Sequence, residues 1–187
     1  MKCSTLNLRG LCKDCASSKG GIKQVLIGYY GDFTPEYAYE TEDTEHNNPS
    51  RISGITVATG AKVFKYEFRK GTGSMTSTLN VDVTNGVNYV STELILQFTK
   101  METRKRIEMA VLSIEELVIF VQDSNGNWYY LGNDEPVVAT AGTGQTGQAV
   151  GDGNFYNITF TDEANTWPLL VDDSVVTGLT VGNDCTE

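Results

Sequence analysis

The chain has 187 residues and a formal net charge of −10, from 24 acidic and 14 basic side chains. A general nucleic-acid-binding protein needs a basic face, so this balance argues against that class. No apolar run has the length of a membrane span and no signal peptide opens the sequence, so we expect no membrane partner. Residues typical of strands and turns are abundant, which predicts a mainly β fold in one domain.

We expect residues 1–21 to form an N-terminal arm that ends at Gly20-Gly21, and residues 22–187 to form a single β-rich domain. The domain should begin with a short strand, Ile22 to Ile27. Residues 28–53 and 139–153 are predicted to be long loops, because neither segment shows a sustained apolar pattern. The first loop contains Tyr37 and Tyr39, which are candidates for contact with a neighbouring subunit because tyrosine is enriched at interfaces.

Two short strands are expected at 55–59 and 63–68, followed by a long hairpin. In the hairpin, apolar and polar residues alternate on both sides of Asn85-Gly86, a dipeptide that favours a two-residue I′ turn. That turn predicts four opposite pairs: Val81 with Val90, Leu79 with Thr92, Ser77 with Leu94 and Met75 with Leu96. A slip of one residue would move the apolar side chains of one strand to the other face of the sheet.

A helix from about Lys100 to Ser113 is predicted to follow, because Thr99 and Glu102 match a capping box. This helix has two apolar stripes. One contains Ile107, Ala110, Val111 and Ile114; the other contains Met101, Met109 and Leu112. One stripe can pack on the sheet, which leaves the second for a neighbouring subunit, and we take Met101, Met109 and Leu112 as interface candidates. A helix wedged between two parts of one core is the alternative.

The remaining elements are strands. Leu117 to Val121 is a nearly continuous apolar run, which is typical of a strand covered on both faces. A turn at Asp123–Gly126 leads into a second hairpin strand, Trp128 to Leu131. Phe155 to Thr161 alternates as a strand, and we expect terminal edge strands at 167–171 and 175–181.

The four cysteines lie near the two ends of the chain. Cys12 and Cys15 have the spacing of a zinc knuckle, and Cys3 and Cys185 would complete a four-sulfur site if the termini meet. The second half of such a site lacks a paired motif, which favours the interpretation as free thiols. We therefore expect no metal and no cofactor, with these cysteines as the zinc candidates.

Other motifs do not indicate an enzyme. Residues 142–147 spell the dinucleotide pattern GxGxxG, but no βαβ unit surrounds them. His46 is the sole histidine, and no nucleophile motif accompanies it. The sequence predicts a non-enzymatic scaffold.

Several segments resemble the core of virion structural proteins from tailed phages of Bacteroidetes hosts, including crAss-like phages. They include Tyr66-Glu67-Phe68-Arg69-Lys70-Gly71-Thr72-Gly73, the hairpin, and Leu96-Gln97-Phe98-Thr99-Lys100-Met101-Glu102-Thr103. Residues 117–131 and 147–160 continue the likeness, and the opening with Cys3, Cys15 and Gly20-Gly21-Ile22-Lys23 also looks typical of this group. The likeness spans most of the chain, and its motifs are structural rather than catalytic.

This resemblance implies a tail-tube-like β-sandwich or half-barrel with one flanking helix and long loops. It implies a virion protein, assembled in the host cytoplasm, that forms a ring of six or twelve copies in the tail or portal neck. Its partners would be neighbouring tail, collar or portal proteins, with genomic DNA passing through the ring. An acidic channel wall would suit that role, because like charge keeps phosphate from binding. A capsid decoration or fibre-anchoring protein is the alternative.

Overall fold

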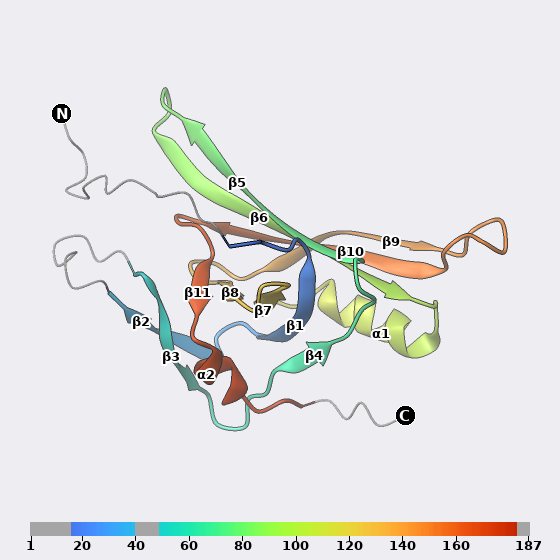
Figure 1. Ribbon diagram of the computed structural model, residues 1–187, viewed down its shortest axis with the longest axis horizontal. Coiled ribbons are helices and arrows are strands. Elements are labelled where there is room, and N and C mark those ends of the chain that lie inside the picture. The colour runs from blue at the N-terminus through green and yellow to red at the C-terminus, as the bar shows by residue number, and fades with distance from the viewer. Residues whose placement is uncertain (1–15, 40–48, 183–187) are drawn as a thin grey trace.

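The computed structural model describes residues 16–39 and 49–182 as two β-sheets with two short helices (Figure 1). The expected mainly β fold with a flanking helix is confirmed. The larger sheet has seven strands in the order β2-β3-β11-β8-β7-β1-β4. Their bounds are β1 Ile22–Tyr29, β2 Phe33–Ala38, β3 Arg51–Val57, β4 Phe64–Tyr66, β7 Leu117–Asp123, β8 Trp128–Leu131 and β11 Leu169–Val171.

The smaller sheet has four strands in the order β5-β6-β10-β9, and every neighbouring pair is antiparallel. Their bounds are β5 Gly73–Asp82, β6 Val87–Thr99, β9 Val138–Gln145 and β10 Phe155–Ala164. The β5–β6 hairpin extends beyond the body of the molecule on one side, and the β9–β10 hairpin extends on the other (Figure 1).

Strand β7 lies between two hydrophobic cores. Leu117, Ile119 and Val121 point toward the four-stranded sheet, where they pack with residues such as Leu94 and Phe160. The alternate residues of β7, Val118 and Phe120, belong to a second core on the other face of the seven-stranded sheet. The second core is completed by Phe33, Ile52, Val63, Trp128, Tyr130 and Val176, among others. The prediction of a strand covered on both faces is confirmed.

The β5–β6 hairpin has the predicted faces but not the predicted register. Leu79 lies opposite Val90 and Asp82 opposite Val87, so residues 83–86 form a four-residue loop. The carboxylate of Asp82 explains the longer loop, because it accepts hydrogen bonds from the N–H groups of Thr84 and Asn85 at 2.9 and 3.2 Å. The register thus differs by two residues from the predicted one, and a shift of two keeps each side chain on its face.

The first helix, α1 (Thr103–Leu112), begins later than predicted, and no side chain caps its first turn. Lys100 has a φ of 68°, in the left-handed region, which is incompatible with a helix that starts there. The N–H groups of Lys100 and Met101 instead donate to the backbone and side-chain oxygens of Asn154, at 2.7 and 2.8 Å. The predicted capping box is therefore wrong.

Both predicted long loops contain strands. In the first segment, 28–53, lie β2 and the start of β3, which pair antiparallel. In the second, 139–153, residues 139–145 belong to β9. The predicted edge strand at 175–181 is also wrong, because Asp173–Thr177 forms the helix α2, which covers the second core through Val176. The strand predicted at 167–171 is confirmed in part as β11, but its predicted edge position is wrong, because β11 lies between β3 and β8.

Candidate assembly surface

The four-stranded sheet has one buried and one open face. Side chains on its inner face, which meets the first core, include Leu94, Leu96, Ile158 and Phe160. Its outer face carries the alternate residues of each strand. On the two central strands these are Ser91, Glu93, Ile95, Gln97 and Thr99, opposite Glu163, Thr161, Thr159, Asn157 and Phe155. The outer face is thus lined mainly by hydroxyl, amide and carboxyl groups.

This sheet contains no Lys or Arg. No basic residue occurs between 71 and 99 or between 107 and 187, and these segments include all of β5, β6, β9 and β10. Three of its four acidic residues, Asp82, Glu93 and Glu163, are on the outer face, whereas Asp162 is buried on the inner face. The outer face therefore carries negative and no positive side-chain charge.

Both edges of the sheet are unpaired in the described part of the chain, since β5 and β9 each have a single neighbour. The direction of the β5 edge groups follows from its register. Gln97 N–H donates to Thr72 O at 3.0 Å, and Gly73 is the next residue, opposite Leu96. Because bonded and non-bonded pairs alternate in an antiparallel ladder, Met75, Ser77, Leu79 and Val81 direct their backbone N–H and C=O groups away from β6. Such an edge can accept a strand from another chain.

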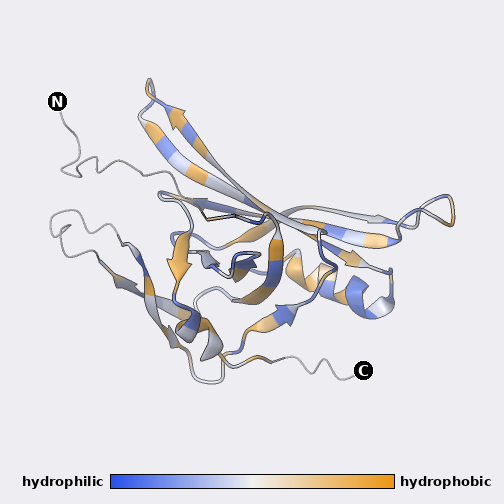
Figure 2. Cartoon of the chain, viewed as in Figure 1, coloured by the Kyte–Doolittle hydropathy of each residue, from blue (hydrophilic) through white to orange (hydrophobic). Residues whose placement is uncertain are grey.

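The protruding β5–β6 hairpin is apolar at several exposed positions. Strand β6 continues past the end of its pairing with β10, whose last pair joins Ala164 to Val90. Beyond this point Val81 is 58% and Val83 90% exposed, and Leu79 and Val87 are exposed as well. Figure 2 shows apolar residues recurring along this hairpin. These side chains have no core of their own to enter, so the hairpin is a surface suited to contact with another chain.

A groove of about 390 Å³ lies between α1 and β9, lined by Met109, Ser113 and residues 139–144 among others. Its β9 wall is built from small residues. At Gly144 a Cβ would approach Tyr156 to 3.0 Å and the methyl group of Met101 to 3.1 Å. The glycine therefore lets these two side chains lie against the strand, and residues 142–145 of the GxGxxG pattern belong to β9.

The structure places the predicted interface residues differently. Leu112 is 3% exposed and belongs to the first core, and Met109 is half-buried against it, so neither forms a free stripe. The exposed stripe is the other one, with Ile107 at 52% and Ile114 at 78%. Met101 is half-buried. The prediction that Leu112 is an exposed interface residue is wrong, because the side of α1 that carries Leu112 packs on the first core.

The two predicted interface tyrosines also differ. Tyr37 is half-buried, and its hydroxyl donates to Asn133 Oδ1 at 2.9 Å, which ties β2 to the segment after β8. Tyr39 is 45% exposed just after β2 and stays an interface candidate.

The cysteines and the histidine singled out in the sequence cannot be placed in the structure. Cys3, Cys12, Cys15, Cys185 and His46 lie outside the described residues. Within 16–39 and 49–182, no group of His, Cys, Asp and Glu side chains is arranged to hold a metal ion. Neither of the two described helices has the length and hydrophobicity of a membrane span.

Two polar contacts, one buried and one half-buried, connect the two sheets and attach α1 to β4. Asp162, on the inner face of β10, accepts the N–H of Gly132 at 3.0 Å, and burial raises the pKa of its carboxyl group to about 6. The hydroxyl of Tyr66 donates to the carboxylate of Glu108, which joins β4 to α1. Burial, and then this bond, raise the pKa of Tyr66 well above its ordinary value.

Comparison with known proteins gives one short match. A family model described as a putative cell wall binding repeat matches residues 119–136, which contain most of β7, the turn and β8. No curated protein and no solved structure matches the chain.

Three of the four aromatic residues of the matched stretch, Phe120, Trp128 and Tyr130, are buried in the second core, and Tyr129 is half-buried. Trp128 is 4% exposed and its Nε1–H donates to Asp173 at 3.0 Å. Tyr130 is 1% exposed and packs edge-on against Phe120, with ring centroids 5.2 Å apart. The match therefore covers a hairpin in which most of the aromatic side chains are part of the core, and it does not by itself assign a ligand.

The hairpin was predicted, but its protrusion beyond the body of the molecule and the open face of the four-stranded sheet were not. The absence of Lys and Arg from 71–99 and 107–187 was readable in the sequence. What could not be read was that these segments come together as one sheet.

Proposed function

We propose that the protein is a non-enzymatic virion structural protein of a tailed phage. Copies of it join into a ring, in the tail or the portal neck, through which the genome passes. The observation that carries this proposal is the four-stranded sheet, which combines two unpaired edges with an outer face that has no basic side chain.

The number of strands supports a closed ring. The strands alternate in direction from β5 to β9, so β9 runs opposite to β5. If β5 of a second copy pairs with β9 of the first by rotation about an axis along the strands, the junction is antiparallel, like every other pair. Repeating this operation closes a barrel without an edge, which removes the aggregation hazard of two bare edges.

The composition of the outer face supports a channel for DNA. DNA binds proteins chiefly when Lys and Arg displace the counterions of its phosphates. Threonine, serine and glutamine side chains with a few carboxylates offer no such exchange, so a duplex can slide without being held. The resemblance to phage virion proteins supports the same role.

The test uses the edge geometry of β5. Leu79→Pro removes a backbone N–H that points away from β6, so the β5–β6 ladder keeps its bonds while the edge loses a donor. Leu79→Thr is the matched control, because it shortens the same side chain and keeps the N–H. Native mass spectrometry and negative-stain images of the wild type and both variants give the readout.

We expect rings from the wild type and from Leu79→Thr, and monomers with an unchanged circular dichroism spectrum from Leu79→Pro. A wild type that stays monomeric or trimeric at high concentration, and binds purified phage heads, would contradict the ring and support a capsid decoration protein instead.

A further inference from the structure

Two Asn-Gly dipeptides occur in the sequence, and both lie in turns between paired strands. Asn85-Gly86 is in the loop of the β5–β6 hairpin, and Asn125-Gly126 is in the turn between β7 and β8. Asparagine before glycine can lose its side-chain amide without an enzyme, because glycine has no Cβ that would keep its nitrogen away from the preceding side chain. The surroundings of each dipeptide therefore decide whether it can react.

The side chain of Asn125 is held by the residues that precede β1. Its Oδ1 accepts the Lys19 N–H at 2.8 Å, and its Nδ2 donates to Lys19 O and to Asp123 Oδ2, each at 3.1 Å. The nitrogen that would attack it, Gly126 N, donates its hydrogen to Asp123 O at 3.2 Å. Rotation of the amide toward Gly126 would break these hydrogen bonds, so the fold opposes the reaction at Asn125.

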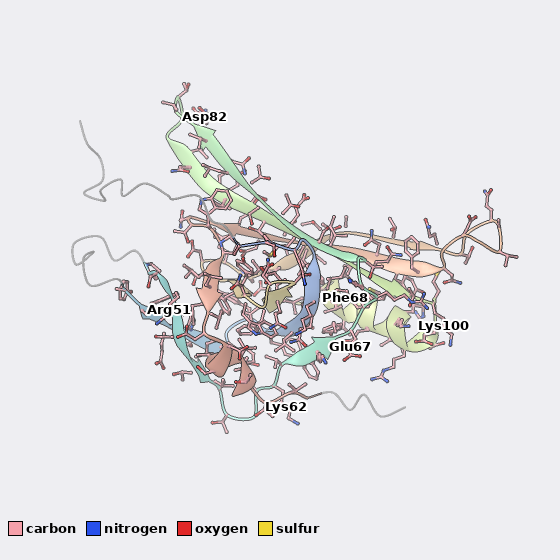
Figure 3. The ribbon with its side chains drawn as sticks, viewed as in Figure 1. Arg51, Lys62, Glu67, Phe68, Asp82 and Lys100 are labelled. Carbon is pink, nitrogen blue, oxygen red and sulfur yellow. The ribbon has the colours of Figure 1, made fainter. Side chains whose placement is uncertain are left out.

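The side chain of Asn85 is held less firmly, at the tip of the protruding hairpin, where Figure 3 labels Asp82. It forms one hydrogen bond, from Nδ2 to Asp82 Oδ2 at 2.6 Å, and its Oδ1 accepts none from the described residues. The Gly86 N–H has no acceptor among those residues either. A Cβ on Gly86 would meet no atom within 4 Å, and residues 83–87 are all exposed. The hairpin tip thus leaves both reacting groups accessible to each other and to water.

We propose that Asn85 is a site of spontaneous deamidation in the folded protein, whereas Asn125 is protected by its hydrogen bonds. Gly86 N loses its proton to hydroxide and attacks Asn85 Cγ. The Cγ–Nδ2 bond then breaks, and the leaving nitrogen takes a proton from water and departs as ammonia. Water opens the resulting succinimide ring. Cleavage between Gly86 N and Cγ gives aspartate, and cleavage between Gly86 N and the backbone carbonyl carbon of residue 85 gives isoaspartate. The net change is the loss of ammonia and the gain of water.

The reaction changes how the hairpin tip is held. It replaces a donor to Asp82 with a carboxylate, so two like charges then lie side by side in the loop. In isoaspartate the backbone also gains a methylene group, which lengthens the loop. The Thr84 N–H depends on the same Asp82 carboxylate, to which it donates at 2.9 Å, so we expect the loop to open. The reaction needs only the hairpin and solvent, and it does not depend on the proposed ring.

The experiment compares the two dipeptides within one chain. The wild type is incubated in mildly alkaline buffer, which favours proton loss from the attacking nitrogen, with one sample folded and the other unfolded in urea. Proteolytic digestion and mass spectrometry give the rate of deamidation at each asparagine, and labelling by a protein isoaspartate methyltransferase detects isoaspartate. Asn85→Gln is the control, because its longer side chain closes a ring much less readily. Asp82→Ala releases the amide of Asn85 from its one hydrogen bond.

In urea the two sites should react at similar rates, because each asparagine follows a hydroxyl residue, Thr84 or Ser124, and precedes glycine. In the folded protein Asn85 should react at least about tenfold faster than Asn125, which keeps its hydrogen bonds to the fold. Asp82→Ala should accelerate the reaction at residue 85, and Asn85→Gln should abolish it. Amide hydrogen exchange at residues 83–87 should be faster in the aged wild type than in equally aged Asn85→Gln.

Three results would contradict the proposal. Equal rates at the two sites of the folded protein, or a faster reaction at Asn125, would show that the hydrogen bonds to Lys19 and Asp123 give no protection. An Asn85 that reacts only in urea would show that the bond to Asp82 is sufficient to block the reaction. Unchanged exchange at residues 83–87 after Asn85 has reacted would overturn the opening of the loop.

Discussion

Asp162 and Gly132 join the two sheets through one buried hydrogen bond, in which the carboxylate of β10 accepts the backbone N–H just after β8 at 3.0 Å. Gly132 has a φ of 96°, and a Cβ there would come within 3.1 Å of Leu117 O. Position 132 therefore suits glycine. The carboxyl group of Asp162 is 2% exposed, so its charge is held in a poorly solvated place.

Stability should consequently fall as pH rises through the titration of Asp162. Burial raises the pKa from 3.8 to about 6, with the nearby charges of Asp134 and Glu163 adding to the effect and the Gly132 bond opposing it. The folded state thus binds a proton more tightly than the unfolded state. The resulting stabilisation is fully present below about pH 4 and is lost as pH rises through 6, with a change of up to about 3 kcal/mol.

Urea unfolding between about pH 4 and pH 8 checks this pH dependence. Asp162→Asn should flatten the profile, since an amide oxygen still accepts the Gly132 N–H but does not titrate. Asp152→Asn is the control of opposite sign, because backbone N–H groups of Ala149 and Gln148 lower the pKa of Asp152. A profile of Asp162→Asn identical to that of the wild type would contradict the assignment.

The bond between Tyr66 and Glu108 should contribute to the attachment of α1. Tyr66→Phe leaves the Glu108 carboxylate without this donor, and we expect a loss of about 1–3 kcal/mol in the free energy of unfolding. Tyr29→Phe, at a 43% exposed tyrosine, is the matched control and should change little. Chemical denaturation of both variants gives the comparison. Equal effects would mean that the Tyr66 bond is not a significant contribution.

The orientation of α1 can be tested with two truncations on its two apolar stripes. Leu112→Ala opens a cavity in the first core and should cost about 2–5 kcal/mol. Ile107→Ala removes a 52% exposed side chain of the same helix and should stay within about 0.5 kcal/mol in the monomer. Thermal unfolding of both variants gives the comparison. If Ile107→Ala were the more destabilising variant, the stripe that contains Ile107 would be the one packed on the core.

The Asp82 carboxylate should determine the tip of the β5–β6 hairpin. Asp82→Ala removes the acceptor for Thr84, Asn85 and the Asn85 side chain, and we expect faster amide hydrogen exchange at residues 83–87 with little change in the core. Asp82→Asn keeps one acceptor oxygen and should lie between this variant and the wild type. Unchanged exchange in Asp82→Ala would show that Asn85-Gly86 alone sets the loop.

The face of each long strand could be predicted from the sequence, because alternation requires only a local pattern. Leu94, Leu96 and Phe98 are buried as their spacing indicates. The register could not, because a side chain, Asp82, competes with the Asn85-Gly86 turn for the backbone of the loop. The start of α1 was missed for a related reason: Asn154, distant in sequence, accepts hydrogen bonds from the N–H groups of Lys100 and Met101 and holds these residues outside the helix.

The candidate surface was less predictable than the fold. Strand β9 has the composition of a loop, and the glycine at 144 is explained by the side chains of Tyr156 and Met101 that lie against it. The sequence of the predicted helix has two apolar stripes of similar hydrophobicity. The local sequence therefore does not indicate that Leu112 rather than Ile114 is buried in the core. Such choices are made by tertiary contacts, which the pattern of one segment does not record.

The burial of β7 on both faces has a consequence for how the chain folds. Its neighbour β1 pairs with it across a large sequence separation, as in Val25 with Val121, and the core on its other face also needs Val171 and Val176. Removal of β7 would expose both hydrophobic cores, because each core uses one face of this strand. The two cores should therefore unfold in one cooperative transition. Contacts of such long range also make folding slow. The unpaired edges of β5 and β9 therefore exist as finished strands only after nearly the whole chain has been made.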